Sequence, residues 1–217
     1  MLKLKLQFHG APGHTTALRE ETFENLLLNA GILLKNCDYS TIANAGALKT
    51  AISAAVNGTT GALGTVISAT RGGGSCVITR SIRHPEADGL RYGYKGDSFV
   101  DSVDCRLSTT LIEITIENLK MALGSAVITG SSPKQTLKLK TAIAKEDYLT
   151  NLCWVGDLAD GRYALICLYN ALNEADFNLT WADKNEATLP VEFHAKQSNL
   201  DDYDYAPFEI LYFDPAT

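Results

Sequence analysis

Short apolar runs, some alternating and some continuous, recur along the chain between clusters of Gly, Pro, Asn and Asp. Val, Ile, Thr and aromatic residues are frequent in these runs, which is typical of β-strands. The expected strands cover residues 65–70, 76–79, 90–94, 152–155, 162–169, 177–181, 189–196 and 208–213. Residues 162–169 are apolar on both faces, so their strand is expected at the centre of a sheet. The pattern predicts a mainly β protein.

Residues 189–196 show the clearest alternation. Their odd positions are all apolar and their even positions carry Pro190, Glu192, His194 and Lys196. Because successive side chains of a strand point to opposite faces, one face is expected to be buried and the other polar. The residues alone leave open whether that polar face meets solvent or another subunit.

Two segments have helical spacing. In residues 41–56, apolar residues recur about every four positions, and Asn57-Gly58 is expected to end the helix. In residues 113–123, Thr110 and Glu113 match a capping box and Gly124 supplies a stop. One stripe of this second helix is apolar and is expected to pack on a sheet: Ile112, Ile116, Leu119 and Leu123. Residues 23–34 fit either two short strands or a helix that ends at Gly31.

Two glycine-containing segments are interpreted as structural turns. Asp160-Gly161 separates two apolar runs and predicts a two-residue hairpin. Arg71, Gly72 and Gly73 precede another strand; a backbone phosphate cradle is the alternative, but a P-loop ending and a following helix pattern are both missing. Residues 1–20 are expected to form a short strand followed by a mobile arm, and residues 57–64 a flexible link. A single domain over residues 1–217 is expected.

Composition narrows the function. The chain has 217 residues, 46% of them hydrophobic, and a formal net charge of −6, which argues against a duplex-DNA binder with a basic face. The five cysteines contain no C-x-x-C pair, so reduced and mostly buried thiols are expected. The first nine residues lack the apolar core of a signal peptide, and no apolar run reaches the ~18 residues of a membrane span.

Candidate chemistry is sparse. Cys76, His84, Glu86 and Asp88 are close in sequence, but they lack a metal-ligand spacing. Asp97, Asp101 and Asp104 do not follow the EF-hand order and are expected on a solvated edge. Ser75-Cys76 has no recognisable base partner. We therefore expect no metal, no cofactor, no catalytic residue and no enzymatic activity.

The order of these features resembles the major tail tube protein of long-tailed, siphovirus-type bacteriophages. The similar pieces lie at residues 24–31, 69–73, 113–123, 160–163, 170–173, 188–193 and 207–210. The resemblance implies a β-sandwich or barrel with one flanking amphipathic α-helix and long loops. It also implies a structural virion protein whose hexameric rings stack into the tube that conducts DNA from capsid to host.

The resemblance further implies partners and a location. The partners would be other copies of the chain, the tape measure protein and tail completion or initiation proteins, with DNA only in transit. The location would be the virion tail, after synthesis in the bacterial cytoplasm. The polar residues expected to face the lumen are Glu192, His194, Lys196, Asp97 and Asp101. Two other classes stay open: a ligand- or receptor-binding β-sandwich, for which Tyr92, Tyr94, Tyr203 and Tyr205 are the candidate aromatics, and a small α+β enzyme.

Overall fold

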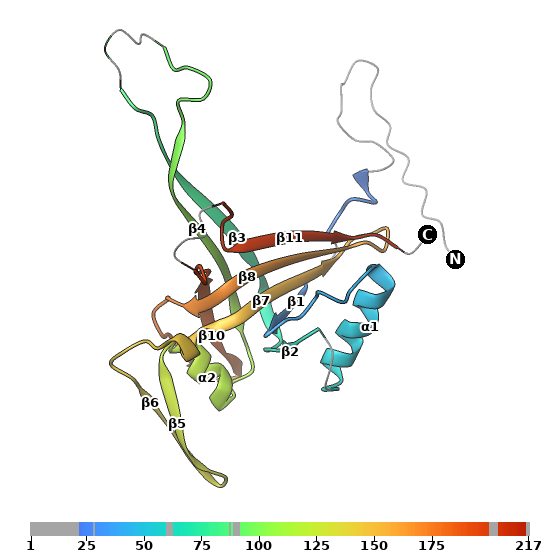
Figure 1. Cartoon of the computed structure of the whole chain (residues 1–217). Helices are drawn as coiled ribbons and strands as arrows, with labels where there is room; N and C mark the ends of the chain where they lie inside the picture. The colour runs from blue at the N-terminus through green and yellow to red at the C-terminus, as the bar shows by residue number, and fades with distance from the viewer. Residues whose placement is uncertain are drawn as a thin grey trace.

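The computed structural model describes residues 22–27, 29–59, 63–86, 88, 92–199 and 204–215 (Figure 1). The expected N-terminal strand and arm lie outside the described residues. So do residues 60–62 of the expected flexible link and residues 90–91 of one expected strand. The described part is mainly β, with two helices, as the hydrophobic pattern predicts.

Nine strands form one antiparallel sheet that divides into two layers. The first layer has the order β2 (Thr65–Val66), β1 (Ile32–Lys35), β7 (Leu149–Asp157), β8 (Tyr163–Asn173) and β11 (Phe208–Phe213). The second has the order β10 (Asn185–His194), β4 (Phe99–Leu111) and β3 (Thr70–Arg83), with β9 (Thr180–Ala182) beside β10. The layers are joined where the last residues of β8, Leu172 and Asn173, pair with β10.

The position of β8 confirms the expectation of a central strand. It pairs with β7 on one side and with β11 and β10 on the other. One face of β7 and β8 packs between the layers, where Leu152 and Leu168 meet Leu107 and Phe193. The opposite face packs under the first helix. The strand is apolar on both faces because both faces are covered.

Helix α1 (Ala45–Val56) lies where helical spacing predicts it. The side chain of Asn44 accepts a hydrogen bond from the Ala47 amide at the start, and Asn57 is the C-terminal cap. Its buried residues cover the outer face of the first layer, against the core residues Leu34, Cys153, Leu165, Cys167 and Phe213.

Helix α2 (Ile116–Ala122) begins later than expected, and the Thr110–Glu113 capping box is wrong. Thr110 belongs to β4, and the Glu113 carboxylate accepts a hydrogen bond from the Ala69 amide 2.8 Å away. Thr115 is the N-terminal cap instead and accepts from the Asn118 amide. The described residues thus form two α-helices, as the helical spacing predicts, where the resemblance implied one flanking helix.

The two segments interpreted as turns differ in outcome. Asp160 and Gly161 do turn the chain between β7 and β8, but the Leu158 amide donates to the Arg162 carbonyl, which closes a three-residue rather than a two-residue connection. Arg71, Gly72 and Gly73 lie inside β3, where the register with β4 shifts between Thr70 and Gly74. They form a strand irregularity, not a connecting turn.

Two hairpins project from the body (Figure 1). The longer one consists of the distal parts of β3 and β4 and the segment between them; the shorter one is β5 (Ala126–Ser131) with β6 (Lys134–Leu139), which pair only with each other among the described strands. The expected strand at residues 90–94 is wrong for residues 92–94, which are described and not in a strand. In residues 23–34, the strand alternative is favoured, because β1 follows Gly31 and Leu27 forms an isolated bridge with Leu158.

Candidate functional site

A polar face covers one side of the β3–β4–β10 layer. On β4 it consists of Asp104, Arg106, Ser108 and Thr110, and on β10 of Pro190, Glu192 and His194. The register places Ser108 between Ser75 of β3 and Glu192 of β10, and it places His194 opposite Arg106. Intervening residues such as Leu107, Val191 and Phe193 are buried on the other side. This confirms the alternation expected for residues 189–196.

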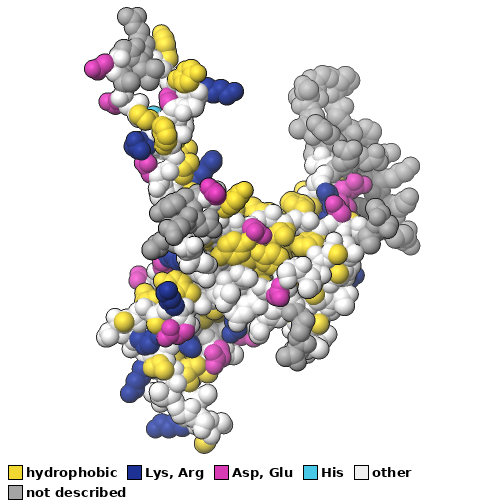
Figure 2. Space-filling view, in the orientation of Figure 1, with side chains coloured by type: hydrophobic (Ala, Val, Ile, Leu, Met, Phe, Trp, Pro, Cys, Tyr) yellow, Lys and Arg dark blue, Asp and Glu magenta, His cyan; other side chains and the backbone are white. Residues whose placement is uncertain are grey.

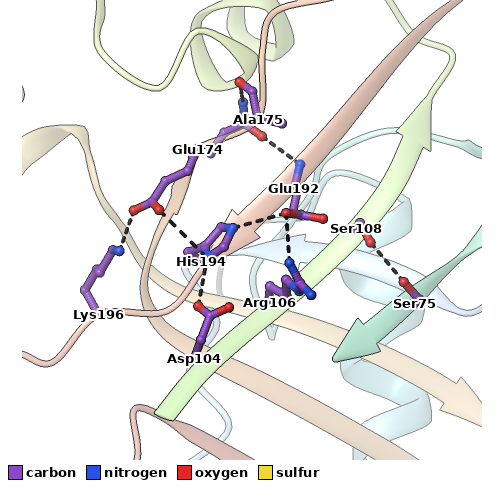
Figure 3. A network of polar contacts seen from close by, with 10 residues as sticks. Ser75, Asp104, Arg106, Ser108, Glu174, Ala175, Glu192, His194 and Lys196 are labelled. Atoms are coloured by element: carbon purple, nitrogen blue, oxygen red, sulfur yellow. Dashed lines mark hydrogen bonds and ion pairs between the residues drawn. The ribbon is translucent and has the colours of Figure 1, made fainter. Parts of the chain in front are cut away.

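His194 lies at the centre of a charged cluster on the polar face (Figure 3). Its Nδ1 is 2.9 Å from an oxygen of Asp104 and 3.8 Å from an oxygen of Glu174, and its Nε2 is 3.2 Å from Glu192. Only 15% of the His194 side chain is exposed. These three carboxylates come from β4, from the segment after β8 and from β10, so the cluster ties three parts of the fold together.

Two cations balance the carboxylates. Lys196 forms an ion pair with Glu174, and Arg106 Nη1 lies 3.7 Å from Glu192. Both pairs are partly exposed, and pairs of that kind contribute little net stability. Their main effect is to leave the cluster of mixed sign rather than strongly acidic.

Hydroxyl groups continue the polar face toward the start of β3. The Ser75 and Ser108 side chains are hydrogen bonded at 2.9 Å, and Arg71 forms a 3.1 Å ion pair with Glu186 (Figure 3 shows the serine pair). A shallow polar hollow of about 550 Å³ lies here, between the glycines of β3 and Glu192. Its lining includes the hydroxyls of Ser75 and Ser108 and the carboxylates of Asp176 and Glu192.

The structure brings together three of the five expected lumen residues, Glu192, His194 and Lys196. The other two lie on the projecting hairpin. Asp97 accepts a hydrogen bond from the Tyr94 amide at 2.9 Å, which with the His84 ring lowers the pKa of its carboxyl. Asp101 pairs with Arg83 at 3.2 Å, next to a register shift.

Sequence reasoning did not place Arg106 and Glu174 in the cluster, and it wrongly expected Asp104 on a solvated edge, whereas β4 pairs on both sides and Asp104 contacts His194. Three members of the cluster, Asp104, Arg106 and Glu174, were therefore not expected there. For the first two a signal was present, because the polar residues at 104, 106, 108 and 110 alternate with Cys105, Leu107 and Leu111. For Glu174 no local signal exists, since its contact with His194 depends on the pairing of β8 with β10.

The cysteines confirm the expectation of reduced, mostly buried thiols. All five are free; four are buried and Cys76 is partly exposed. Burial raises the pKa of the Cys76 thiol and raises that of Cys105 to about 11, so both stay protonated and weakly nucleophilic near neutral pH.

Within the described residues, no group of three or more His, Cys, Asp or Glu side chains is arranged to hold a metal ion. Cys76, His84, Glu86 and Asp88 were considered as metal ligands because they are close in sequence. In the structure the His84 ring contacts Asp97 and Ser98. No helix in the described ranges combines the length and the apolar character needed to cross a membrane.

Large apolar side chains are exposed along the projecting hairpin (Figure 2). Tyr92 and Tyr94, between its strands, are 85% and 73% exposed. Nearer the body, the exposed residues are Ile78, Ile82, Phe99 and Val100. In Figure 2 the apolar side chains of the hairpin lie among charged ones.

The chain matches no protein-family model, and a comparison with curated proteins finds no match either.

Proposed function

We propose that the chain is a structural subunit of a bacteriophage tail tube. In this proposal six copies form a ring, and rings stack into a tube that conducts DNA from the capsid to the host. Its partners are other copies of the chain, in the same ring and in neighbouring rings, the tape measure protein and the tail completion or initiation proteins. The subunit itself carries out no catalysis. The observation that carries the proposal is the amphipathic β3–β4–β10 layer with its open edge.

The open edge belongs to β3. This strand runs from Thr70 to Arg83 and pairs with β4 alone among the described strands. It contains no proline and no lysine, and its features that can blunt an edge are three arginines and two register shifts toward its ends. Unpaired amides and carbonyls along such an edge can pair with a strand of a neighbouring copy. Among the described strands, β11 pairs only with β8, which supplies a second open edge.

Closure of such edges into a ring removes them, as in a β-barrel. The apolar face of the β3–β4–β10 layer is already covered by the other layer of the same chain. Only the polar face is left to line an aqueous channel. Its mixed charges offer no cationic patch for phosphates, which suits DNA that must slide past without binding.

The projecting hairpin supports contacts between copies. A two-stranded hairpin alone is marginally stable in water, and this one exposes Ile82, Phe99 and Val100. Packing against a neighbouring ring would remove that apolar surface from water. The hairpin extends away from the body (Figure 1), so its far end can reach a second molecule.

A ligand- or receptor-binding β-sandwich is the second candidate. Exposed aromatic side chains favour it: Tyr92 and Tyr94 on the hairpin, Trp181 at 73% and Tyr205 at 80% exposed. Aromatic residues of this kind are common hot spots of recognition. A stable monomer that binds a small ligand or a receptor would favour this candidate.

Electron microscopy and sedimentation velocity over a range of concentrations test the proposal. We expect hexameric rings or tubes with a central channel. The variant Val77→Lys/Thr79→Lys places two charges on the β3 edge and should stay monomeric. The matched control is Val127→Lys/Thr129→Lys in β5, because both segments read Val-Ile-Thr and Val77 and Val127 are 38% and 42% exposed.

Two outcomes would contradict the proposal. One is a wild-type protein that is monomeric at every concentration, even with tail-initiating partners present. The other is assembly that is lost equally in the β3 variant and the β5 control, which would show that added charge rather than edge pairing matters. A ring with the polar face on its outside would overturn the lumen assignment.

A further inference from the structure

An apolar groove lies between the two layers, next to the start of β3. It has a volume of about 330 Å³ and is lined mainly by Leu27, Leu33, Leu107, Trp154 and Ile166. Gly73, Gly74 and Cys76 of β3 form one side. We call it the interlayer groove. Its size and apolar lining are those of a binding site rather than of a packing defect.

The groove adjoins a backbone edge that has no strand partner. Residues 73–76 of β3 pair with β4 on one side only among the described strands. An open edge beside an apolar hollow is the arrangement that binds an extended segment, because the edge pairs with the backbone and the hollow takes alternate side chains. The occupant should therefore be a short strand with one apolar face.

The chain contains one segment of this type outside the described residues. Residues 2–8 read Leu-Lys-Leu-Lys-Leu-Gln-Phe, so a strand here would place Leu2, Leu4, Leu6 and Phe8 on one face and the lysines on the other. The following 13 residues, 9–21, span up to ~43 Å when extended. They enter the described structure at Thr22, five positions before Leu27 of the groove wall.

We propose that residues 2–8 of the same chain dock along β3 at residues 73–76 and insert their apolar side chains into the interlayer groove. A connection of 13 residues gives an effective concentration of about millimolar, which favours the chain's own segment over a second copy. Docking leaves residues 77–83 of β3 open. The inference therefore does not depend on assembly and can be tested on dilute monomer.

Cys76 provides the assay. It lines the groove and is the partly exposed cysteine, while Cys37, Cys105, Cys153 and Cys167 are all at most 3% exposed. The rate at which a maleimide or disulfide reagent labels Cys76 is measured by mass spectrometry, with the fluorescence of Trp154 as a second signal. Deletion of residues 2–8 should raise the labelling rate about tenfold or more; tenfold corresponds to 1.4 kcal/mol of docking free energy.

Paired point variants separate docking from a general loss of folding. Leu4→Asp/Leu6→Asp should accelerate labelling of Cys76 as the deletion does, because the substituted face no longer suits the groove. Lys3→Asp/Lys5→Asp carries the same new residues on the opposite face and should keep the protection. If the deletion unfolds the protein, all five thiols will react. The labelling rates of Cys76 in the two paired variants then show whether residues 2–8 dock in the groove.

Three results would overturn the inference. Equal labelling rates in the full chain and the deletion variant would show that residues 2–8 do not cover Cys76. Loss of protection in both paired variants would show that the apolar face is not what docks. Protection that disappears on dilution, at concentrations where sedimentation shows the loss of a larger species, would assign the groove to the segment of a second copy.

Discussion

Replacing Asn173 with alanine should weaken the junction between the two layers. The Asn173 side chain is 7% exposed and sits at the end of β8, where that strand pairs with β10. Its Nδ2 donates to the Ala122 carbonyl at 2.6 Å, and its Oδ1 accepts from the Glu192 amide at 2.7 Å. One amide group thus joins the last residue of α2, β8 and the polar strand β10.

Asn173→Ala leaves the Ala122 carbonyl and the Glu192 amide without these partners. Each buried polar group left unsatisfied costs about 1–3 kcal/mol, so for these two groups we expect the free energy of unfolding to fall by about 2–6 kcal/mol. In urea unfolding followed by circular dichroism, the midpoint should fall while the m-value stays unchanged.

The matched control is Asn185→Ala. Asn185 is exposed, and its one described side-chain contact, to the Asp183 carbonyl, is 3.5 Å long. Exposed substitutions of this kind usually change stability by less than ~0.5 kcal/mol. If Asn173→Ala loses no more stability than Asn185→Ala, then the hydrogen bonds of Asn173 do not hold the layers together.

Two further changes test the backbone and the charge pairs. A Cβ at Gly124 (φ +71°) would lie 2.7 Å from the Asn173 carbonyl oxygen, whereas one at Gly58 (φ +69°) would meet no atom within 4 Å. Gly58→Ala should therefore show only the ~1–2 kcal/mol of left-handed strain and Gly124→Ala clearly more; equal losses in thermal melts would contradict the close contact. Asp147 accepts hydrogen bonds from Lys140 Nζ at 2.6 Å and from the Ala144 amide at 2.8 Å, which hold the pKa of its carboxyl below the ordinary 3.8. Because the pKa of Asp147 is lower in the folded state, its ionised carboxyl stabilises the fold at neutral pH, and this contribution is lost as the pH falls through the folded pKa. Asp147→Asn should therefore be less stable than wild type at pH 7 and equally stable in strongly acidic buffer. A difference in stability that does not depend on pH would exclude this pairing as the cause.

Local periodicity was sufficient to predict much of the sheet. The alternation in residues 189–196 correctly gave the buried and polar faces of β10, because a strand's side chains change sides at every residue whatever its neighbours are. The two-sided apolar character of residues 162–169 correctly placed β8 at the centre, since only a strand covered on both faces has that composition.

Tertiary pairing decided the features that were predicted wrongly. Thr110 and Glu113 have the spacing of a capping box, but β4 continues to Leu111, which pairs with Leu189 on one side and Thr70 on the other. Those partners are 78 and 41 positions away in the sequence, so no local pattern could reveal that the strand would continue and delay the helix to Thr115. The same reason applies to Gly72 and Gly73. They lie within a strand because Thr70 before them and Gly74 after them pair with β4.

The charged cluster shows where sequence reasoning reaches its limit. Glu192, His194 and Lys196 alternate along one segment and were expected on the same face. The charged side chains that contact them, however, come from other elements. Asp104 contacts His194 because β4 pairs with β10 in this register, and Glu174 contacts it because the end of β8 pairs with β10. The sign of a surface depends on such partners, so a strand pattern can predict which face is polar and not whether that face repels or attracts an anion.

The distribution of apolar surface gives a final argument about assembly. Inside the body, the apolar faces of β7, β8 and β10 are covered by the chain's own second layer and by α1. Beyond the body, the hairpin exposes Ile82, Phe99 and Val100. A sequence that covers its apolar faces so completely in one region and leaves them open in another is consistent with two stages of burial, the first within the subunit and the second between copies. Under the proposed assembly, the hairpin would gain most of its stability from contacts between copies.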